Sequence, residues 1–163
     1  MSVTLLSSSG DKFDAPLYHC MQCKTLANFI DEDPDVDVIP VPLVDSKVVA
    51  TLLEFFTTRL SVAREITENP ALDSETDLTD DQRDRLRHRA AAFFHDHEMA
   101  DLLEILLGAN YLNCDAVIDA IATVIASRIS GKTRDEMRDI LGIESDFTPE
   151  EEEKILSEHA WAF

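Results

Sequence analysis

Length and composition indicate one globular domain, or one domain plus an extension, because 163 residues with an apolar share of 45% can form a hydrophobic core. A net charge of −19, from 33 acidic against 14 basic residues, disfavours nucleic acid and anionic membranes as partners, since both present phosphates. Three cysteines, Cys20, Cys23 and Cys114, form an odd number without the spacing of a disulfide framework, so we expect a reducing compartment.

The N-terminal half predicts a hairpin, a helix, an edge strand and a second helix. Residues 3–15 contain two short runs around a Ser-Gly-Asp turn, which is typical of a hairpin. Residues 24–30 place three apolar side chains on one side of a short helix. The two prolines within residues 38–43 restrict this segment to an edge strand or an extended connector. Residues 46–60 are apolar on most sides and predict a well-buried helix.

A polar, acidic stretch at residues 61–80 predicts a mobile surface loop. The chain that follows has the patterns of helices. Residues 98–112 place several leucines on one broad stripe, and residues 114–130 are apolar on nearly all sides. The second half is therefore expected to be helical throughout.

Three of these helices begin with a predicted capping box, in which a threonine and a residue three positions on cap each other's backbone N–H. Gly142 fits the position just after a helix end, where a left-handed backbone is common. The glutamates at residues 150–153 lie in the first turn of the last helix and face the positive end of its dipole. The capping pairs are Thr79 with Gln82, Thr133 with Glu136, and Thr148 with Glu151.

Motifs that suggest chemistry are all incomplete. Cys20 and Cys23 have CxxC spacing, but no second ligand pair accompanies them, so we interpret them as core cysteines. The two histidines within residues 95–97 point to different faces of a helix, and residues 130–133 lack the earlier glycine of a phosphate-binding loop. The arginines of residues 83–89 are expected to pair with the chain's own carboxylates. We therefore predict no enzyme, no metal and no cofactor.

The C-terminal segment carries many apolar side chains for its length. If exposed, they would form a protein interface, but they also suit an intramolecular core, and the residues alone leave both interpretations open. Besides the apolar residues 115–130, they are Met137, Ile140, Leu141, Ile143, Ile155, Leu156, Trp161 and Phe163.

Residues 106–161 strongly resemble the C-terminal half of the Skp family (S-phase-kinase-associated protein), the F-box-binding adaptor subunits of SCF ubiquitin ligases. The resemblance rests on Asn-Tyr-Leu at 110–112, Gly-Lys-Thr at 131–133, the acidic run after Asp-Phe-Thr at 146–153, and a late tryptophan. The N-terminal half agrees more loosely. The chain departs from the family by having no tryptophan before Phe94, and by having arginine where a proline commonly follows Gly-Lys-Thr.

The resemblance implies an α+β fold, with a BTB/POZ-like cullin-binding domain at residues 1–130 and an F-box-binding helical extension at residues 115–163. It implies a non-catalytic adaptor that links F-box substrate receptors to a cullin in an SCF E3 ubiquitin ligase, for ubiquitin-dependent protein degradation. The alternative is a divergent Skp-like subunit of a non-ligase F-box or BTB complex that does not bind cullin. We expect a cytoplasmic and nuclear protein, which could form a homodimer when free.

The resemblance also implies site residues by their position in the family motifs. Asn110 and Tyr111 match residues that face the cullin. The expected F-box-binding residues are Val117, Ile121, Val124, Met137, Ile140, Leu141, Phe147 and Trp161.

Overall fold

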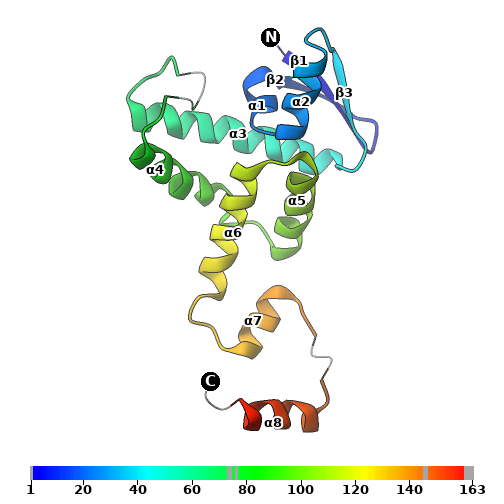
Figure 1. The fold of residues 1–163 in the computed structure, drawn as a ribbon, viewed down its shortest axis with the longest axis vertical. Coiled ribbons are helices and arrows are strands. Elements are labelled where there is room, and N and C mark those ends of the chain that lie inside the picture. The colour runs from blue at the N-terminus through cyan, green and yellow to red at the C-terminus, as the bar shows by residue number, and fades with distance from the viewer. Residues whose placement is uncertain (1, 73–74, 76, 145–146, 160–163) are drawn as a thin grey trace. The chain divides into compact units, whose positions relative to one another are not determined.

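A computed structural model (Figure 1) describes residues 2–72, 75, 77–144 and 147–159, and gives only the backbone of residues 149, 152 and 156. The chain is mixed α+β, which confirms the predicted fold class, and it divides into two compact units, Met1–Ser127 and Arg128–Phe163. Within the described ranges, no helix combines the length and apolar character needed to cross a membrane.

The sheet has three strands in the order β2-β1-β3. Strands β1 (Ser2–Ser7) and β2 (Lys12–Pro16) form the predicted antiparallel hairpin. Strand β3 (Val38–Val41) pairs with β1 in parallel and lies at the edge of the sheet, as its proline content predicts. The chain leaves β3 through a short connection and enters helix α3 (Ser46–Thr67), whose first turns lie beside the sheet (Figure 1).

The first unit contains most of the helices. Helix α2 (Lys24–Glu32) confirms the predicted short helix, whereas α1 (Leu17–Met21) was not predicted. The loop expected at residues 61–80 was wrong at its start, because helix α3 (Ser46–Thr67) continues seven residues into it, and Glu68 then adopts a left-handed conformation. The helical elements of this unit are α1 (Leu17–Met21), α2 (Lys24–Glu32), α3 (Ser46–Thr67), α4 (Asp80–Ala91), the 3-10 turn η1 (Ala92–Phe94), α5 (Met99–Leu112) and α6 (Asp115–Ile129), which crosses the division between the units.

The hydrophobic core of the first unit is centred on α3. Phe55 and Phe56 are buried, and the ring of Phe55 stacks on that of Phe94 with centroids 4.9 Å apart. Leu5 and Ile39 cover this core from the sheet. Phe94 is completely buried in this cluster although the chain has no tryptophan before it.

The second unit contains α7 (Arg134–Leu141) and α8 (Pro149–Glu158). The capping boxes predicted from Thr133 and Thr148 are both present, as is the one at Thr79 in the first unit. Gly142 ends α7 in the left-handed conformation with φ of 66°, which confirms the predicted role of this glycine. None of the described side chains of residues 128–159 is buried.

Candidate interaction surfaces

One line of apolar side chains on α5 faces outward. Leu103, Leu107 and Tyr111 follow one another at intervals of four residues, and their exposed fractions are 42%, 72% and 37%. Leu43, in the connection between β3 and α3, is 73% exposed and lines one groove together with Leu107. We name these four residues the apolar stripe.

The groove beside the stripe has a volume of about 270 Å³ and lies between the β3–α3 connection and α5. Its floor includes Val44, Val48 and Gly108. A Cβ atom on Gly108 would lie 2.7 Å from Cγ1 of Val48, which is closer than carbon atoms can approach. The glycine therefore allows α5 to lie directly against α3, and this close approach positions Leu43 and Leu107 at the same groove.

Asn110 and Tyr111, the predicted cullin-facing residues, are both exposed near the end of α5. The helix ends at Leu112, and Asn113 adopts a left-handed conformation with φ of 57°. The N–H of Cys114 then donates to the carbonyl of Ala109 at 2.9 Å, which closes the helix end in a Schellman arrangement. The two predicted residues thus lie on a helix terminus whose geometry depends on the residues that follow it.

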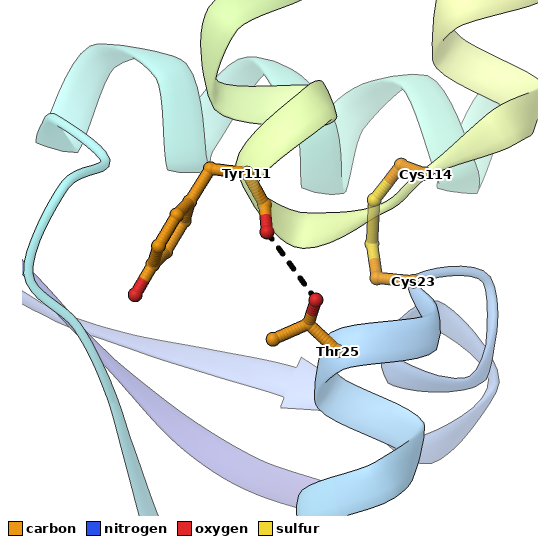
Figure 2. Close-up of a disulfide and its surroundings, with 4 residues drawn as sticks. All are labelled: Cys23, Thr25, Tyr111 and Cys114. Atoms are coloured by element: carbon orange, nitrogen blue, oxygen red, sulfur yellow. Dashed lines mark hydrogen bonds between the residues drawn. A yellow bond between two sulfur atoms is a disulfide. The ribbon is translucent and has the colours of Figure 1, made fainter.

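This helix end is tied to the start of α2 (Figure 2). Thr25 Oγ1 donates to the carbonyl of Tyr111 at 3.3 Å, and the N–H of Lys24 donates to the carbonyl of Asn113 at 3.2 Å. The sulfurs of Cys23 and Cys114 form a disulfide, and the Cα atoms of the two residues are 4.4 Å apart.

The cysteine count did not predict this pairing. All three cysteines are buried, as expected for core cysteines, but the two bonded ones are 91 residues apart in the sequence. Because Cys23 is bonded to Cys114, Cys20 and Cys23 do not act together as a CxxC pair. Cys20 is the free thiol, and burial raises its pKa to about 11.

Two members of the arginine cluster form the expected pairs with the chain's own carboxylates. Arg87 lies within 3.8 Å of carboxylate oxygens of Asp84 and Asp119, and Arg89 pairs with Glu65. The positive charge of these two arginines is therefore partly neutralised within the chain.

The second unit presents apolar side chains on both of its helices. In α7, Met137, Ile140 and Leu141 lie at i, i+3 and i+4, on one face, and all three are half-buried. Beyond α7, Ile143 is 56% exposed and Phe147 is 48% exposed. Ile155 of α8 is 37% exposed. We name these six residues the C-terminal apolar surface.

Helix α6 does not contribute its predicted residues to a surface. Val117 and Ile121 are completely buried in the core of the first unit, and Val124 is 4% exposed. These three side chains are therefore not accessible to a partner, and they pack α6 into the core instead. Trp161 lies outside the described residues.

The sequence interpretation missed three residues of the stripe: Leu43, Leu103 and Leu107. It placed the leucines of α5 on one broad stripe, whereas the structure buries Leu102 and exposes Leu103 and Leu107. The available signal was spacing, because Leu103 and Leu107 precede Tyr111 by eight and four residues and must share its face.

Comparisons with known proteins give a consistent result. A family described as "Skp1 family, dimerisation domain" matches residues 117–162. SKP1-like protein 11 of Arabidopsis thaliana is 34% identical over 163 residues, which cover 99% of this chain and 96% of the relative. SKP1-like protein 1 of Oryza sativa subsp. japonica is 32% identical over 164 residues, with coverage of 99% and 94%. The similarity therefore extends over both units.

Proposed function

The chain belongs to the Skp1 family, and from that premise we propose that it is a non-catalytic adaptor that links F-box proteins to a cullin in an SCF ubiquitin ligase. The observation that carries the proposal is that the chain has two separate apolar surfaces, one on each of its compact units. An adaptor needs two such surfaces, because it must hold two partners at once.

The apolar stripe is the proposed cullin-binding surface. Burial of a leucine side chain contributes about 1.5–3 kcal/mol, so the exposed Leu43 and Leu107 would supply much of the binding energy. Asn110 and Tyr111 lie at the end of the same helix and would add polar and aromatic contacts. The strongly acidic chain favours a basic partner surface around this apolar centre.

The C-terminal apolar surface is the proposed F-box-binding surface. Met137, Ile140 and Leu141 have the spacing with which one helix packs against another, as in recognition of a helical partner. Ile143 and Phe147 are more exposed than these three, and an F-box protein would cover them. The acidic first turn of α8 would keep the free surface soluble.

The test is simultaneous capture of a purified cullin N-terminal domain and a purified F-box protein. The double variant Asn110→Lys with Tyr111→Lys should lose cullin binding by about 100-fold, since it places two charges in the interface, and should keep F-box binding. The double variant Ile143→Asp with Phe147→Asp should do the reverse. Each variant is the folding control for the other.

Two results would contradict the proposal. If neither partner is captured by the wild-type chain, the adaptor function is wrong. If the F-box protein is captured and the cullin is not, the chain is a divergent subunit of a complex without a cullin.

We also propose that two free copies pair through the C-terminal apolar surface, since the family description for residues 117–162 names dimerisation. Sedimentation should show a dimer that an F-box protein converts to a complex with one copy of each chain. For such an adaptor we propose a place in the cytoplasm and nucleus.

A further inference from the structure

The Cys23–Cys114 disulfide joins two helix ends directly beside the proposed cullin-binding residues. Cys23 comes directly before α2. Cys114 lies between α5 and α6, two residues after the end of α5. Figure 2 shows the bridge beside Tyr111, on the same junction as the contact between Tyr111 and Thr25. Nothing in the Skp-family resemblance or in the names of the relatives accounts for this bridge.

We propose that reversible reduction of the Cys23–Cys114 disulfide regulates the proposed cullin-binding site, by releasing the end of α5 that carries Asn110 and Tyr111. This inference rests on the proposed function, because it names the regulation of the same site. The oxidised chain is the form that holds the cullin-facing residues in place.

Cys114 couples the bridge to both neighbouring helices through its backbone. Its N–H donates to Ala109 and closes α5, and its carbonyl accepts from the N–H groups of Val117 and Ile118, at 3.1 and 3.2 Å, and opens α6. A displacement of Cys114 therefore changes the end of α5 and the start of α6 together. The disulfide fixes this residue to α2.

Without the bridge, the junction is held by the backbone hydrogen bond from Lys24 to Asn113 and by exposed side-chain interactions. The bond from Thr25 to the Tyr111 carbonyl is exposed, and so is the ion pair between Lys24 and Asp115, each of whose side chains is 62% exposed. Exposed pairs of this kind contribute little, because water and salt screen them. Once reduced, the two sulfur atoms are no longer bonded and separate to van der Waals contact, so the helix ends lose their covalent connection. Reduction therefore favours an opening of this junction.

The chemistry is a thiol–disulfide exchange with a dithiol reductant. One thiolate of the reductant attacks a sulfur of the bridge and forms a mixed disulfide, and its second thiol then displaces the protein sulfur. Cys23 and Cys114 become thiols by gaining two electrons and two protons, and the reductant becomes a disulfide. The reverse exchange with an oxidised dithiol restores the bridge.

The compartment expected for this chain favours a regulatory role for this exchange over a purely structural one. In the cytoplasm and nucleus, disulfides are rare, and those that form are mostly transient or redox-sensing. Both bonded cysteines are buried, so exchange requires a local opening of the junction.

The third cysteine does not compete for the bridge at neutral pH. Cys20 lines the same small apolar cavity as Cys23, but burial raises its pKa to about 11, so little of it is the reactive thiolate. Cys20→Ser is therefore a matched control, since it removes a neighbouring buried thiol and leaves the bridge intact.

The experiment compares oxidised and dithiothreitol-reduced full-length chain by thiol titration, hydrogen exchange and cullin binding. Titration after unfolding should find one thiol in the oxidised chain and three in the reduced chain. On reduction, the amides of Asn113 and Cys114 should exchange at least about 10-fold faster, and cullin binding should weaken about 3- to 10-fold, because a preorganised surface is lost.

The variants separate a redox effect from a general effect of the reagent. Cys23→Ser with Cys114→Ser should behave like reduced wild type in both conditions, whereas Cys20→Ser should respond to dithiothreitol as wild type does. If the double variant does not fold, the comparison of oxidised with reduced wild type still decides the result.

The outcomes distinguish this inference from the proposed function. Three thiols in the chain prepared without reductant, or equal exchange at Asn113 and Cys114 in both redox states, would overturn the inference. Faster exchange with unchanged cullin binding would overturn the regulatory role. Faster exchange in a chain that binds no cullin in either state would refute the proposed function while leaving the coupling between the bridge and α5 supported.

Discussion

Gly108 of α5 lies against Val48 of α3 so closely that a single added methyl group would overlap it, at 2.7 Å from Cγ1 of Val48. The contact joins the two helices beneath the apolar stripe. It also explains why a glycine occupies the interior of a helix, where it costs about 1 kcal/mol relative to alanine.

Gly108→Ala should lower the free energy of unfolding by about 1 kcal/mol, because overpacking costs about 1–3 kcal/mol and the gain in helix propensity returns about 1 kcal/mol. The measurement is the urea midpoint followed by circular dichroism. In a chain that also carries Val48→Ala, the alanine at position 108 should no longer destabilise, since the overlapping methyl is gone. A loss of the same size in both backgrounds would contradict this explanation.

Glu75, which lies between α3 and α4 in the sequence, forms a nearly buried ion pair with Arg59 of α3. Nε of Arg59 lies 2.7 Å from one carboxylate oxygen of Glu75, and Nη2 lies 2.8 Å from the other. The Tyr18 hydroxyl donates to the same carboxylate at 2.8 Å. The side chains of Arg59 and Glu75 are only 12% and 13% exposed.

Glu75→Ala should destabilise the first unit by about 3 kcal/mol, since it leaves the guanidinium of Arg59 buried without a counter-charge. The matched control is Glu65→Ala, which removes the exposed ion pair with Arg89 and should cost less than about 1 kcal/mol. Urea denaturation of both variants measures the difference. Equal losses would show that Glu75 contributes no more than an ordinary surface pair.

His19 should make the stability of the fold depend on pH. Its side chain is nearly buried against Phe56, and its Nδ1 has no partner within the described part of the chain. Burial lowers the pKa of His19 below its ordinary value of 6.5, so the folded chain favours the neutral ring and the unfolded chain binds the proton first. The contribution of His19 to stability is therefore complete above pH 6.5 and is lost as the pH falls below that value.

The slope from this one group cannot exceed about 1.4 kcal/mol per pH unit. Urea unfolding of wild type at about pH 7.5 and about pH 5.5 should show the loss, and His19→Gln should reduce it. His88→Gln changes an exposed histidine and should leave the wild-type dependence in place. A wild-type slope that persists in His19→Gln would assign the effect to other groups.

Thr133 should control the local stability of α7. Its hydroxyl accepts from the N–H of Glu136, and the Glu136 carboxylate accepts from the N–H of Thr133 at 2.8 Å and from its hydroxyl at 3.0 Å. The two bonds to the carboxylate lower the pKa of Glu136. Thr133→Ala removes the cap and should cost the helix about 1 kcal/mol, which corresponds to about 5-fold faster amide exchange in α7. Thr123→Ala, within α6, removes a threonine that caps no helix, and it should leave exchange in α7 unchanged.

Features that depend on residues close in sequence could be predicted well. The hairpin, the edge strand and the capping boxes follow from turn residues, prolines and threonines a few positions apart, and all are present. The end of α3 was predicted too early, because residues 61–67 are polar on the surface while Ala63 and Ile66 still face the core. Polarity alone does not end a helix whose buried face continues.

Features that depend on distant residues could not be predicted from the sequence. The disulfide joins residues 91 apart, and an odd number of cysteines does not indicate which two will meet. The family resemblance implied that Val117 and Ile121 bind the F-box, but their packing in the first unit shows that they face inward. Exposed Leu43 became part of the stripe only through the parallel pairing of β3, which places its loop beside α5.

The long interval between the bonded cysteines also affects how the chain is made. A ribosome delivers the N-terminus first, so Cys20 is the only thiol that Cys23 can meet until Cys114 emerges, 91 residues after it. A nascent chain produced in an oxidising environment would therefore close the short ring between Cys20 and Cys23 first. Recombinant production should begin under reducing conditions, with oxidation postponed until after α5 has folded.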